Sequence, residues 1–393
     1  MTNNFFIEVN CHQKSHEGER ISGDVFLSRR IPEENRVIAI LSDGMGHGVK
    51  ANVLATLTSS LALNFTKEHK ESNIIAETVM KALPECSDRK MSYSTFTIVD
   101  IEFDGTTQII EYGNPQCIIF RSDKMFEPEW QCVILSGSNA GKEITTCSFK
   151  SMKEDRIIFF SDGISQSGTG TAKYPTGWGR DNAVEYISKL IQNNASISAK
   201  NISSKLVNIA FQNDLFISKD DISCATVYLR SPRRLMVCSG PPVEPVNDFE
   251  MAQTVKDFKG KKIICGATTS DIISNQLKIP VIEGQTFDDP DLPPISFMEG
   301  IDLVTEGILT LSKVSEILMN YQTLYRRGKG PAEQIIKLLL ESDEIHLLIG
   351  MRINQAHHVP GLPLDLEVRH VVARRIARIL GDKFLKDVYL KFM

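Results

Sequence analysis

The chain has 393 residues, of which 42% are hydrophobic and 24% are charged, as in ordinary globular proteins. Its net charge of −5 excludes the strongly basic surface of a dedicated nucleic-acid-binding protein. At roughly 150 residues per domain, the length predicts two or three domains.

Three features of the sequence indicate the cell compartment. No apolar run reaches the roughly 18 residues of a membrane-spanning helix, and the N-terminus lacks the basic and apolar regions of a signal peptide. Eight cysteines occur without a C-x-x-C pair, which suits reduced thiols and offers no zinc site. We therefore expect a soluble, cytoplasmic protein without membrane insertion and without a nucleic-acid partner.

Short strands with a few interleaved helices are predicted from residue 5 to residue 229. The strands follow from apolar alternation or from continuous apolar runs, and they are predicted over 6–11, 37–41, 94–100, 108–112, 117–120, 156–160 and 223–229. A helix is predicted after Gly48, from apolar residues at helical spacing that include Val53 and Leu57. Further helices are predicted over 74–83, 182–192 and 199–212.

The pattern changes after a linker at 231–234, where proline and charges follow a finished strand. Short apolar strands are predicted over 235–238 and 262–265, and helices over 306–320, 331–341 and 366–380. This alternation predicts a separate α/β domain. The expected domains are residues 1–230 and residues 231–393.

Aspartates stand at the ends of several predicted strands, mostly next to glycine: Asp24, Asp43, Asp162, Asp220 and Asp221. If the fold gathers them, they repel one another unless a cation lies between them. Hard divalent ions such as Mg²⁺ and Mn²⁺ prefer oxygen ligands. Two such ions roughly 3.5–4 Å apart would support hydrolysis of a phosphate ester.

A single Asp-Gly pair is more often a turn than a metal ligand. Asp104-Gly105 serves as the internal comparison, because it separates two predicted strands and is expected to be a turn alone. The other acidic blocks differ from this turn because they occur together and in a fixed order: Gly-Asp, Asp-Gly-Met-Gly-His-Gly, Asp-Gly and Asp-Asp.

Four blocks carry a resemblance to a known family: 21–26 with Gly23-Asp24, 43–48 with the run Asp-Gly-Met-Gly-His-Gly, 160–164, and 220–223. They resemble the bacterial metal-dependent serine/threonine protein phosphatases of signal transduction, in the branch typified by stage II sporulation protein E. The resemblance covers about residues 5–230. It implies an α+β fold, a four-layer α/β/β/α sandwich of two antiparallel sheets, here followed by a C-terminal α/β domain.

The resemblance also implies a site for two ions, Mn²⁺ or Mg²⁺. Asp43 would bridge both ions, and the Gly44 carbonyl would bind the second. Asp162 and Asp220 would hold the first ion, and Asp24 would complete the second site through water.

Two assignments stay open at this stage. Asp221 adjoins the last ligand, and the sequence does not decide which of the pair binds metal, although we favour Asp220. His47 is a candidate general acid or phosphate contact, whereas a histidine that caps the following helix is the simpler interpretation.

The second domain offers one candidate ligand site, a turn at Gly266, Thr268, Thr269 and Ser270 between a strand and a helix. Backbone amides and hydroxyls at such a helix N-terminus suit a small phosphorylated ligand. Residues 302–307 could supply a second lip of the same pocket. The simpler alternative is a capped helix in a structural domain.

Three other patterns are assigned to structure. Cys224 and Arg230 have the spacing of cysteine-dependent phosphatases, but the residues between them predict a strand. Residues 137–143 fail the spacing of a P-loop, and His357-His358 is expected to lie in a surface turn.

The expected function is therefore hydrolysis of phosphoserine or phosphothreonine on a regulatory phosphoprotein by metal-activated water. The resemblance implies a substrate such as an anti-sigma-factor antagonist. Regulation by the C-terminal domain is a separate hypothesis, which rests on the Thr268-Thr269-Ser270 cluster and on the position of that domain after a complete catalytic module. One alternative is a catalytically inactive module that keeps the fold and binds its partner. Another is that the C-terminal domain is itself an enzyme and the phosphatase domain its regulator.

Overall fold

The computed structural model describes residues 5–82, 94–285, 289–321, 328–352, 365–384 and 386–393. The chain divides into two compact units, Met1–Ser231 and Pro232–Met393, called the first and second units below. None of the described helices is both long and apolar enough to cross a bilayer.

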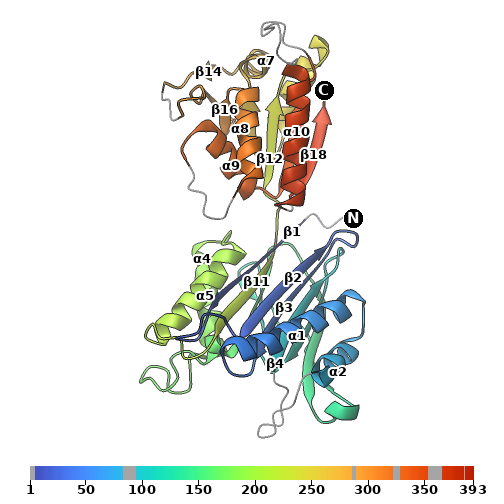
Figure 1. The fold of residues 1–393 in the computed structure, drawn as a ribbon, viewed down its shortest axis with the longest axis vertical. Coiled ribbons are helices and arrows are strands. Elements are labelled where there is room, and N and C mark those ends of the chain that lie inside the picture. The colour runs from blue at the N-terminus through green and yellow to red at the C-terminus, as the bar shows by residue number, and fades with distance from the viewer. Residues whose placement is uncertain (1–4, 83–93, 286–288, 322–327, 353–364, 385) are drawn as a thin grey trace. The chain divides into compact units, whose positions relative to one another are not determined.

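The first unit contains two antiparallel sheets (Figure 1). One has the strand order β2-β3-β4-β5-β9-β8, with β2 (Asp24–Ile31), β3 (Arg36–Gly44), β4 (Ser94–Ile101), β5 (Thr106–Tyr112), β8 (Gln131–Ile134) and β9 (Glu143–Lys150). The other has the order β1-β11-β10-β6-β7, with β1 (Phe6–Lys14), β6 (Ile118–Arg121), β7 (Lys124–Met125), β10 (Asp155–Phe160) and β11 (Ile222–Arg230).

Helices cover the outer face of each sheet. The six-stranded sheet carries α1 (Gly48–Lys67) and α2 (Ser72–Ala82), and the five-stranded sheet carries α4 (Gly179–Asn193) and α5 (Ala199–Asn213), with the short α3 (Asp162–Ser165) after β10. The predicted four-layer α/β/β/α sandwich is confirmed.

The layers explain why the central strands are continuously apolar. In β3, Ala39 and Leu41 face the other sheet, while Ile38 and Ile40 face α1 and α2. A strand covered on both faces buries every side chain, so alternation with polar residues is lost.

Helix α1 forms where the sequence predicts it, but two of the apolar residues that indicated it do not lie on its buried side. Val53 and Leu57 are 60% and 41% exposed. The buried side is made of small residues: Gly48, Ala51, Ala55, Thr58, Ser59, Ala62 and Thr66. Small side chains let the helix lie close to β3, where the Ser59 hydroxyl donates to Ser42 Oγ at 3.0 Å.

The second unit is built on a five-stranded parallel sheet with the order β16-β13-β12-β17-β18. Its strands are β12 (Arg234–Ser239), β13 (Lys261–Cys265), β16 (Leu303–Thr305), β17 (Glu344–Ile349) and β18 (Asp387–Phe392), and β14 (Val281–Ile282) pairs with β15 (Phe297–Met298) outside it. The expected α/β class of this part is confirmed.

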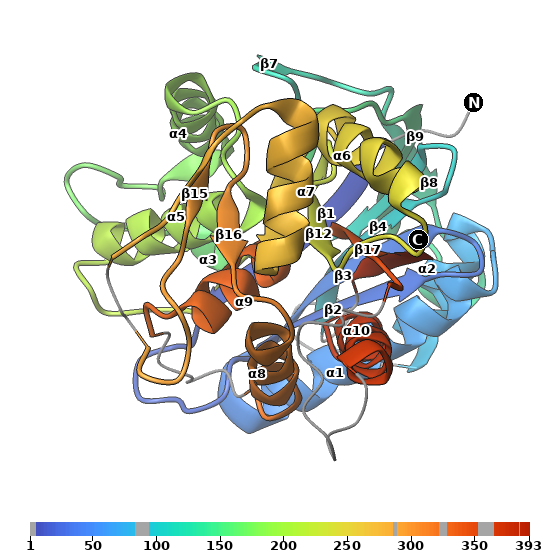
Figure 2. The ribbon, with the colours of Figure 1, turned by 90° about the horizontal axis from the view of Figure 1, so that it is seen from above.

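Helices cover both faces of the parallel sheet (Figure 2). One face packs against α6 (Asp248–Asp257) and α7 (Ala267–Leu277), and the other against α8 (Ile308–Met319), α9 (Pro331–Glu341) and α10 (Asp365–Asp382). The change of face accompanies the reversal of strand order at β12, which defines a doubly wound sheet.

Candidate functional site

The predicted acidic residues lie at strand ends in the first unit. Asp24 begins β2 and pairs with Asp43 near the end of β3 in the antiparallel ladder. Asp162 begins α3, one residue after the end of β10, while Asp220 and Asp221 directly precede β11, the neighbour of β10. Both sheets therefore contribute carboxylates to one cluster.

Asp24 is the most deeply buried member of this cluster, at 2% exposed. Within the described residues, neither of its carboxylate oxygens makes a hydrogen bond. Burial and the charges of Asp221 and Asp220 raise its pKa to about 8, even though Ser223 and Ser161 lie close enough to oppose that shift. A buried carboxyl without donors is stable only when it is protonated or faces a cation.

The other three carboxyls show the same mutual influence. The pKa of Asp43 is raised well above its usual value by burial and by Asp24, Asp162 and Asp220. Burial raises the pKa of Asp162, and burial with the charge of Asp162 raises that of Asp220 to about 6. Asp162 Oδ2 accepts from the Gln166 side chain at 2.7 Å, but its buried Oδ1 has no partner in the described chain.

The chemistry of these carboxylate ligands fits a hard divalent cation. Across the described ranges, no three His, Cys, Asp or Glu side chains converge closely enough to define an ion site by distance alone. However, the cluster offers only oxygen ligands, concentrates negative charge, and leaves buried oxygens of Asp24 and Asp162 without donors. A cation would satisfy all three conditions together.

The glycines beside the aspartates are required by close packing. A Cβ atom on Gly44 would lie 2.0 Å from the Ala51 carbonyl oxygen in the first turns of α1, and one on Gly163 would lie 2.2 Å from the Asp221 carbonyl oxygen. The Gly44 position thus ties the end of β3 to the start of α1.

Asp220 and Asp221 have different surroundings, which bears on the choice left open by the sequence. Both oxygens of Asp221 accept backbone hydrogen bonds, from His16 N–H at 3.0 Å and Gly23 N–H at 2.9 Å. Asp220 accepts only the Asp221 N–H among the described residues, at 2.8 Å through Oδ1. Asp221 therefore positions the chain before Asp24, while Asp220 retains an oxygen for a ligand.

His47 occupies the N-cap position of α1, but its side chain makes no capping hydrogen bond, so that interpretation is wrong. The ring is half exposed, its Nδ1 lies 2.8 Å from Glu19 Oε1, and it stacks on His16 with a centroid distance of 4.3 Å. These contacts hold His47 beside the loop that contains His16.

Sequence reasoning missed His16, whose charge acts on Asp220 and whose N–H binds Asp221. It also missed Ser161 and Ser223, which lie near Asp24. Each is a single common residue in a loop or at a strand end, so no local pattern marks it.

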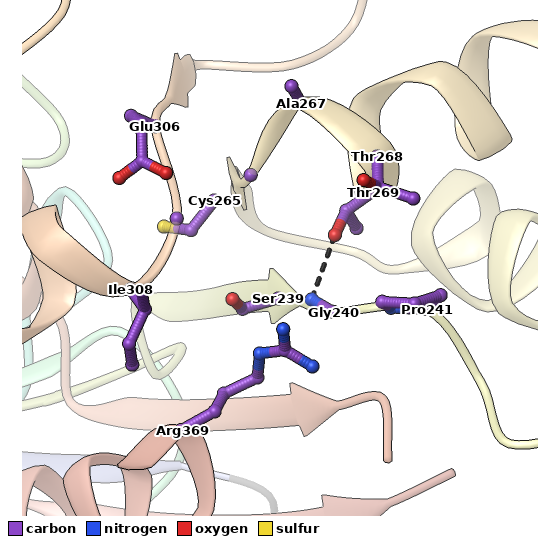
Figure 3. Close-up of a pocket in the computed structure, with 12 residues that line it drawn as sticks. Ser239, Gly240, Pro241, Cys265, Ala267, Thr268, Thr269, Glu306, Ile308 and Arg369 are labelled. Atoms are coloured by element: carbon purple, nitrogen blue, oxygen red, sulfur yellow. Dashed lines mark hydrogen bonds between the residues drawn. The ribbon is translucent and has the colours of Figure 1, made fainter. Parts of the chain in front are cut away.

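In the second unit, Gly266, Thr268 and Thr269 line a pocket at the start of α7 (Figure 3). Ser270 lies outside the lining, and its hydroxyl donates to the Ala267 carbonyl at 2.7 Å. Of the expected second lip, residues 306 and 307 line the pocket, whereas the Asp302 carboxylate accepts the Lys262 N–H.

The patterns assigned to structure behave accordingly where the structure describes them. Asp104 lies in the turn between β4 and β5, where its Oδ1 accepts the Thr106 N–H at 2.8 Å. Cys224 and Arg230 are buried in β11. His357-His358 lies outside the described residues.

Residues 33–229 match the family model described as "Stage II sporulation protein E (SpoIIE)". No curated protein matches the chain.

Several solved structures are similar to part of the chain. The phosphatase domain of SpoIIE from Bacillus subtilis, in a crystal form without domain swapping, is 16% identical, with a TM-score of 0.44 over 59% of this chain and 95% of that one. A longer fragment with part of the regulatory domain is 18% identical, with a TM-score of 0.48 over 58% and 65%. RsbX in complex with magnesium is 20% identical, with a TM-score of 0.41 over 58% and 98%.

Proposed function

Because the chain belongs to the SpoIIE family of metal-dependent serine/threonine protein phosphatases, we propose that it is an active phosphatase of this class, which hydrolyses phosphoserine or phosphothreonine. The observation that carries this proposal is the buried carboxylate cluster, in which oxygens of Asp24 and Asp162 lack hydrogen-bond donors. A module that only binds a partner has no need of this costly arrangement.

Asp43, Asp162 and Asp220 would hold one Mn²⁺ or Mg²⁺ ion, and Asp24 with the Gly44 carbonyl would complete a second site. Bound there, the ions would supply Lewis acidity and an activated water at neutral pH. Gln166 orients the Asp162 carboxylate through its hydrogen bond. Asp221 would act on the site only through the backbone that precedes Asp24.

The catalytically inactive binding module is the competing function. Release of p-nitrophenol from p-nitrophenyl phosphate separates the two, measured on the full chain with Mn²⁺ and with EDTA. We expect turnover that requires Mn²⁺ and falls by at least 100-fold in Asp43→Asn and Asp162→Asn. Asp104→Asn is the matched control, because the same Asp-Gly dipeptide there lies in a turn, where its carboxylate contacts Thr106 and Lys150, and its activity should equal that of the unchanged chain. Silence of the unchanged chain in excess Mn²⁺ would favour the binding module.

We further propose that the substrate is a phosphorylated regulatory protein of the anti-sigma-factor-antagonist type, and that the second unit regulates its dephosphorylation. The family membership supports the proposed substrate class. The presence of a second folded unit after the phosphatase unit supports the proposed regulation. The test compares the rate at which the chain dephosphorylates the purified phosphorylated antagonist with the rate at which it dephosphorylates phosphorylated casein. Equal rates would contradict the substrate assignment without affecting the phosphatase activity itself.

A further inference from the structure

The sheet of the second unit contains a reversal of strand order, and doubly wound sheets bind their ligands next to such a reversal. In chain order its five strands run 3-2-1-4-5, with the reversal between β12 and β17. All pairs are parallel, so the carboxyl ends of β12, β13 and β16 share one edge. Ligands of such sheets bind outside the carboxyl ends of the strands, near the reversal.

A pocket of about 80 Å³ lies at this edge, lined by residues that follow β12, β13 and β16 (Figure 3). Glycine follows each strand: Gly240 after β12, Gly266 after β13 and, one residue later, Gly307 after β16. Gly240 and Gly266 have positive φ angles of 84° and 117°. A Cβ atom on Gly307 would lie 3.2 Å from the Gly266 Cα, so the two turns meet closely.

Two helices begin in this pocket. Gly266 and Gly307 occupy the N-cap positions of α7 and α8, and neither cap supplies a side-chain hydrogen bond to the first turn. The helices have 11 and 12 residues, and the N-termini of such helices favour an anionic group.

Buried polar side chains add an independent indication of a ligand. Ser239 is 1% exposed, and its hydroxyl lines the pocket without a hydrogen bond to any part of the chain that the structure describes. The Arg369 guanidinium, from α10, also lines it, at 8% exposed, and its Nη1 donates to the Gly350 carbonyl at 3.2 Å. A Cβ atom on Gly240 would lie 2.5 Å from Arg369 Nη1, so glycine lets this cation lie across the end of β12. A hydroxyl and a guanidinium are typical phosphate contacts.

Glu306 restricts the ligand further. It lines the same pocket, and its buried Oε2 has no hydrogen-bond partner among the described residues. A carboxylate repels a bare anion and accepts hydrogen bonds from hydroxyl groups. The ligand must therefore carry an anionic group for Arg369 and Ser239 and hydroxyl donors for Glu306.

We propose that this pocket binds a nucleotide, with one phosphate enclosed by Ser239, Arg369 and the two helix N-termini and with ribose hydroxyls at Glu306. The pocket volume of about 80 Å³ fits one phosphate-sized group, whereas sites that enclose a whole drug-sized ligand measure roughly 300–1,000 Å³. The sugar and base therefore extend beyond the enclosed part.

Titration calorimetry on the full chain with AMP, adenosine and inorganic phosphate tests this proposal. EDTA is present throughout, so that no divalent ion draws phosphate to the carboxylate cluster. We expect AMP to bind more tightly than adenosine or phosphate alone. Ser239→Ala should weaken AMP binding at least tenfold, since it removes a hydrogen bond to a charged group. Ser270→Ala, a serine three residues into α7 but outside the lining, should leave it within twofold.

Two further variants locate the site and its specificity. Glu306→Gln should weaken AMP more than inorganic phosphate, and Asp162→Asn in the first unit should leave AMP binding unchanged. The proposal is overturned if AMP at millimolar concentration gives no heat or if adenosine binds as tightly as AMP. It is also overturned if Ser239→Ala and Ser270→Ala bind AMP with equal affinity, or if Asp162→Asn abolishes AMP binding. Thermal melting of every variant confirms that it is folded before its affinity is compared.

Discussion

The Gly23 N–H donates a 2.9 Å hydrogen bond to Asp221 Oδ2, and this contact joins residues 198 positions apart. It links the turn before Asp24 to the start of β11, so the carboxylates of the two sheets are held in one place. Glycine is required there, because a Cβ atom on Gly23 would lie 2.8 Å from both Asp221 Oδ2 and the Ala51 Cβ. Among the described residues, the neighbouring Asp220 accepts only the N–H of the adjacent Asp221.

This difference predicts opposite effects of Asp221→Asn and Asp220→Asn on the metal-free chain. The His16 and Gly23 N–H groups each donate to one oxygen of Asp221. Asparagine at 221 replaces one of these oxygens by an NH₂ group, so one N–H loses its acceptor, which costs roughly 1–3 kcal/mol. Asparagine at 220 removes a charge that raises the pKa of both Asp43 and Asp24 and leaves no N–H unsatisfied, so the melting temperature should rise. Asparagine at 221 also relieves Asp24, but there the unsatisfied buried N–H opposes the gain. Melting curves in EDTA, followed by Mn²⁺ titration, measure both effects. A stabilised Asp221→Asn variant with weakened Mn²⁺ binding would show that Asp221 is the ligand instead.

The fold of the first unit was largely predictable from sequence, for a physical reason. Strands such as β3 and β10 are buried on both faces, so their runs of isoleucine, leucine and phenylalanine are unbroken and their ends are marked by Asp-Gly. Helix α1 was predictable in position but not in orientation. The buried side consists of small residues selected by close packing, whereas Val53 and Leu57, which indicated the helix, are exposed.

The second unit was less predictable. Its parallel order depends on β16, β17 and β18, which were not predicted: β16 has three residues, and β18 has a partly exposed pattern. The pocket residues Ser239 and Arg369 lie 130 positions apart and converge only through the sheet order. By contrast, Gly266 and Thr269 follow a strong short strand, so local sequence was sufficient to single them out.

Gly44→Ala should destabilise the first unit severely. The added Cβ would lie 2.0 Å from the Ala51 carbonyl oxygen, so α1 must move away from β3. Gly46→Ala, in the same loop, meets no atom within 4 Å and only the strain of its φ of 96°, a cost of about 1–2 kcal/mol. Trp130 and Trp178, the only two tryptophans, both lie in the first unit, so fluorescence during urea unfolding reports on that unit alone. Similar midpoints for the two variants would contradict the close contact.

Arg36→Met should also destabilise the first unit strongly. Arg36 is 2% exposed, binds both oxygens of Asp100 at 2.8 and 2.7 Å, and donates to the Thr66 carbonyl at the end of α1. Removing one partner of a buried ion pair costs roughly 3–5 kcal/mol, because the other charge stays buried. The double variant Arg36→Met with Asp100→Leu should recover much of this loss.

The control for that pair is Lys189→Ala, which breaks an exposed ion pair within α4. Its unfolding midpoint should stay within error of the unchanged chain. If Arg36→Met behaves like the control, the buried pair contributes nothing to stability.

Glu111 should make the first unit less stable as pH rises. It is 4% exposed, and burial raises its pKa from 4.5 to about 7, although the Cys117 N–H at 2.8 Å favours the ionised form. The folded state therefore binds this proton more tightly than the unfolded chain does. The resulting stabilisation is complete below pH 4.5 and is lost as pH rises through about 7. Glu111→Gln keeps an acceptor for Cys117 and removes the charge, so its stability relative to the unchanged chain should increase between pH 5 and pH 8, by up to about 3 kcal/mol. Urea unfolding at both pH values, read from tryptophan fluorescence, measures the difference, and a pH-independent difference would show that Glu111 ionises in the folded chain as it does in the unfolded one.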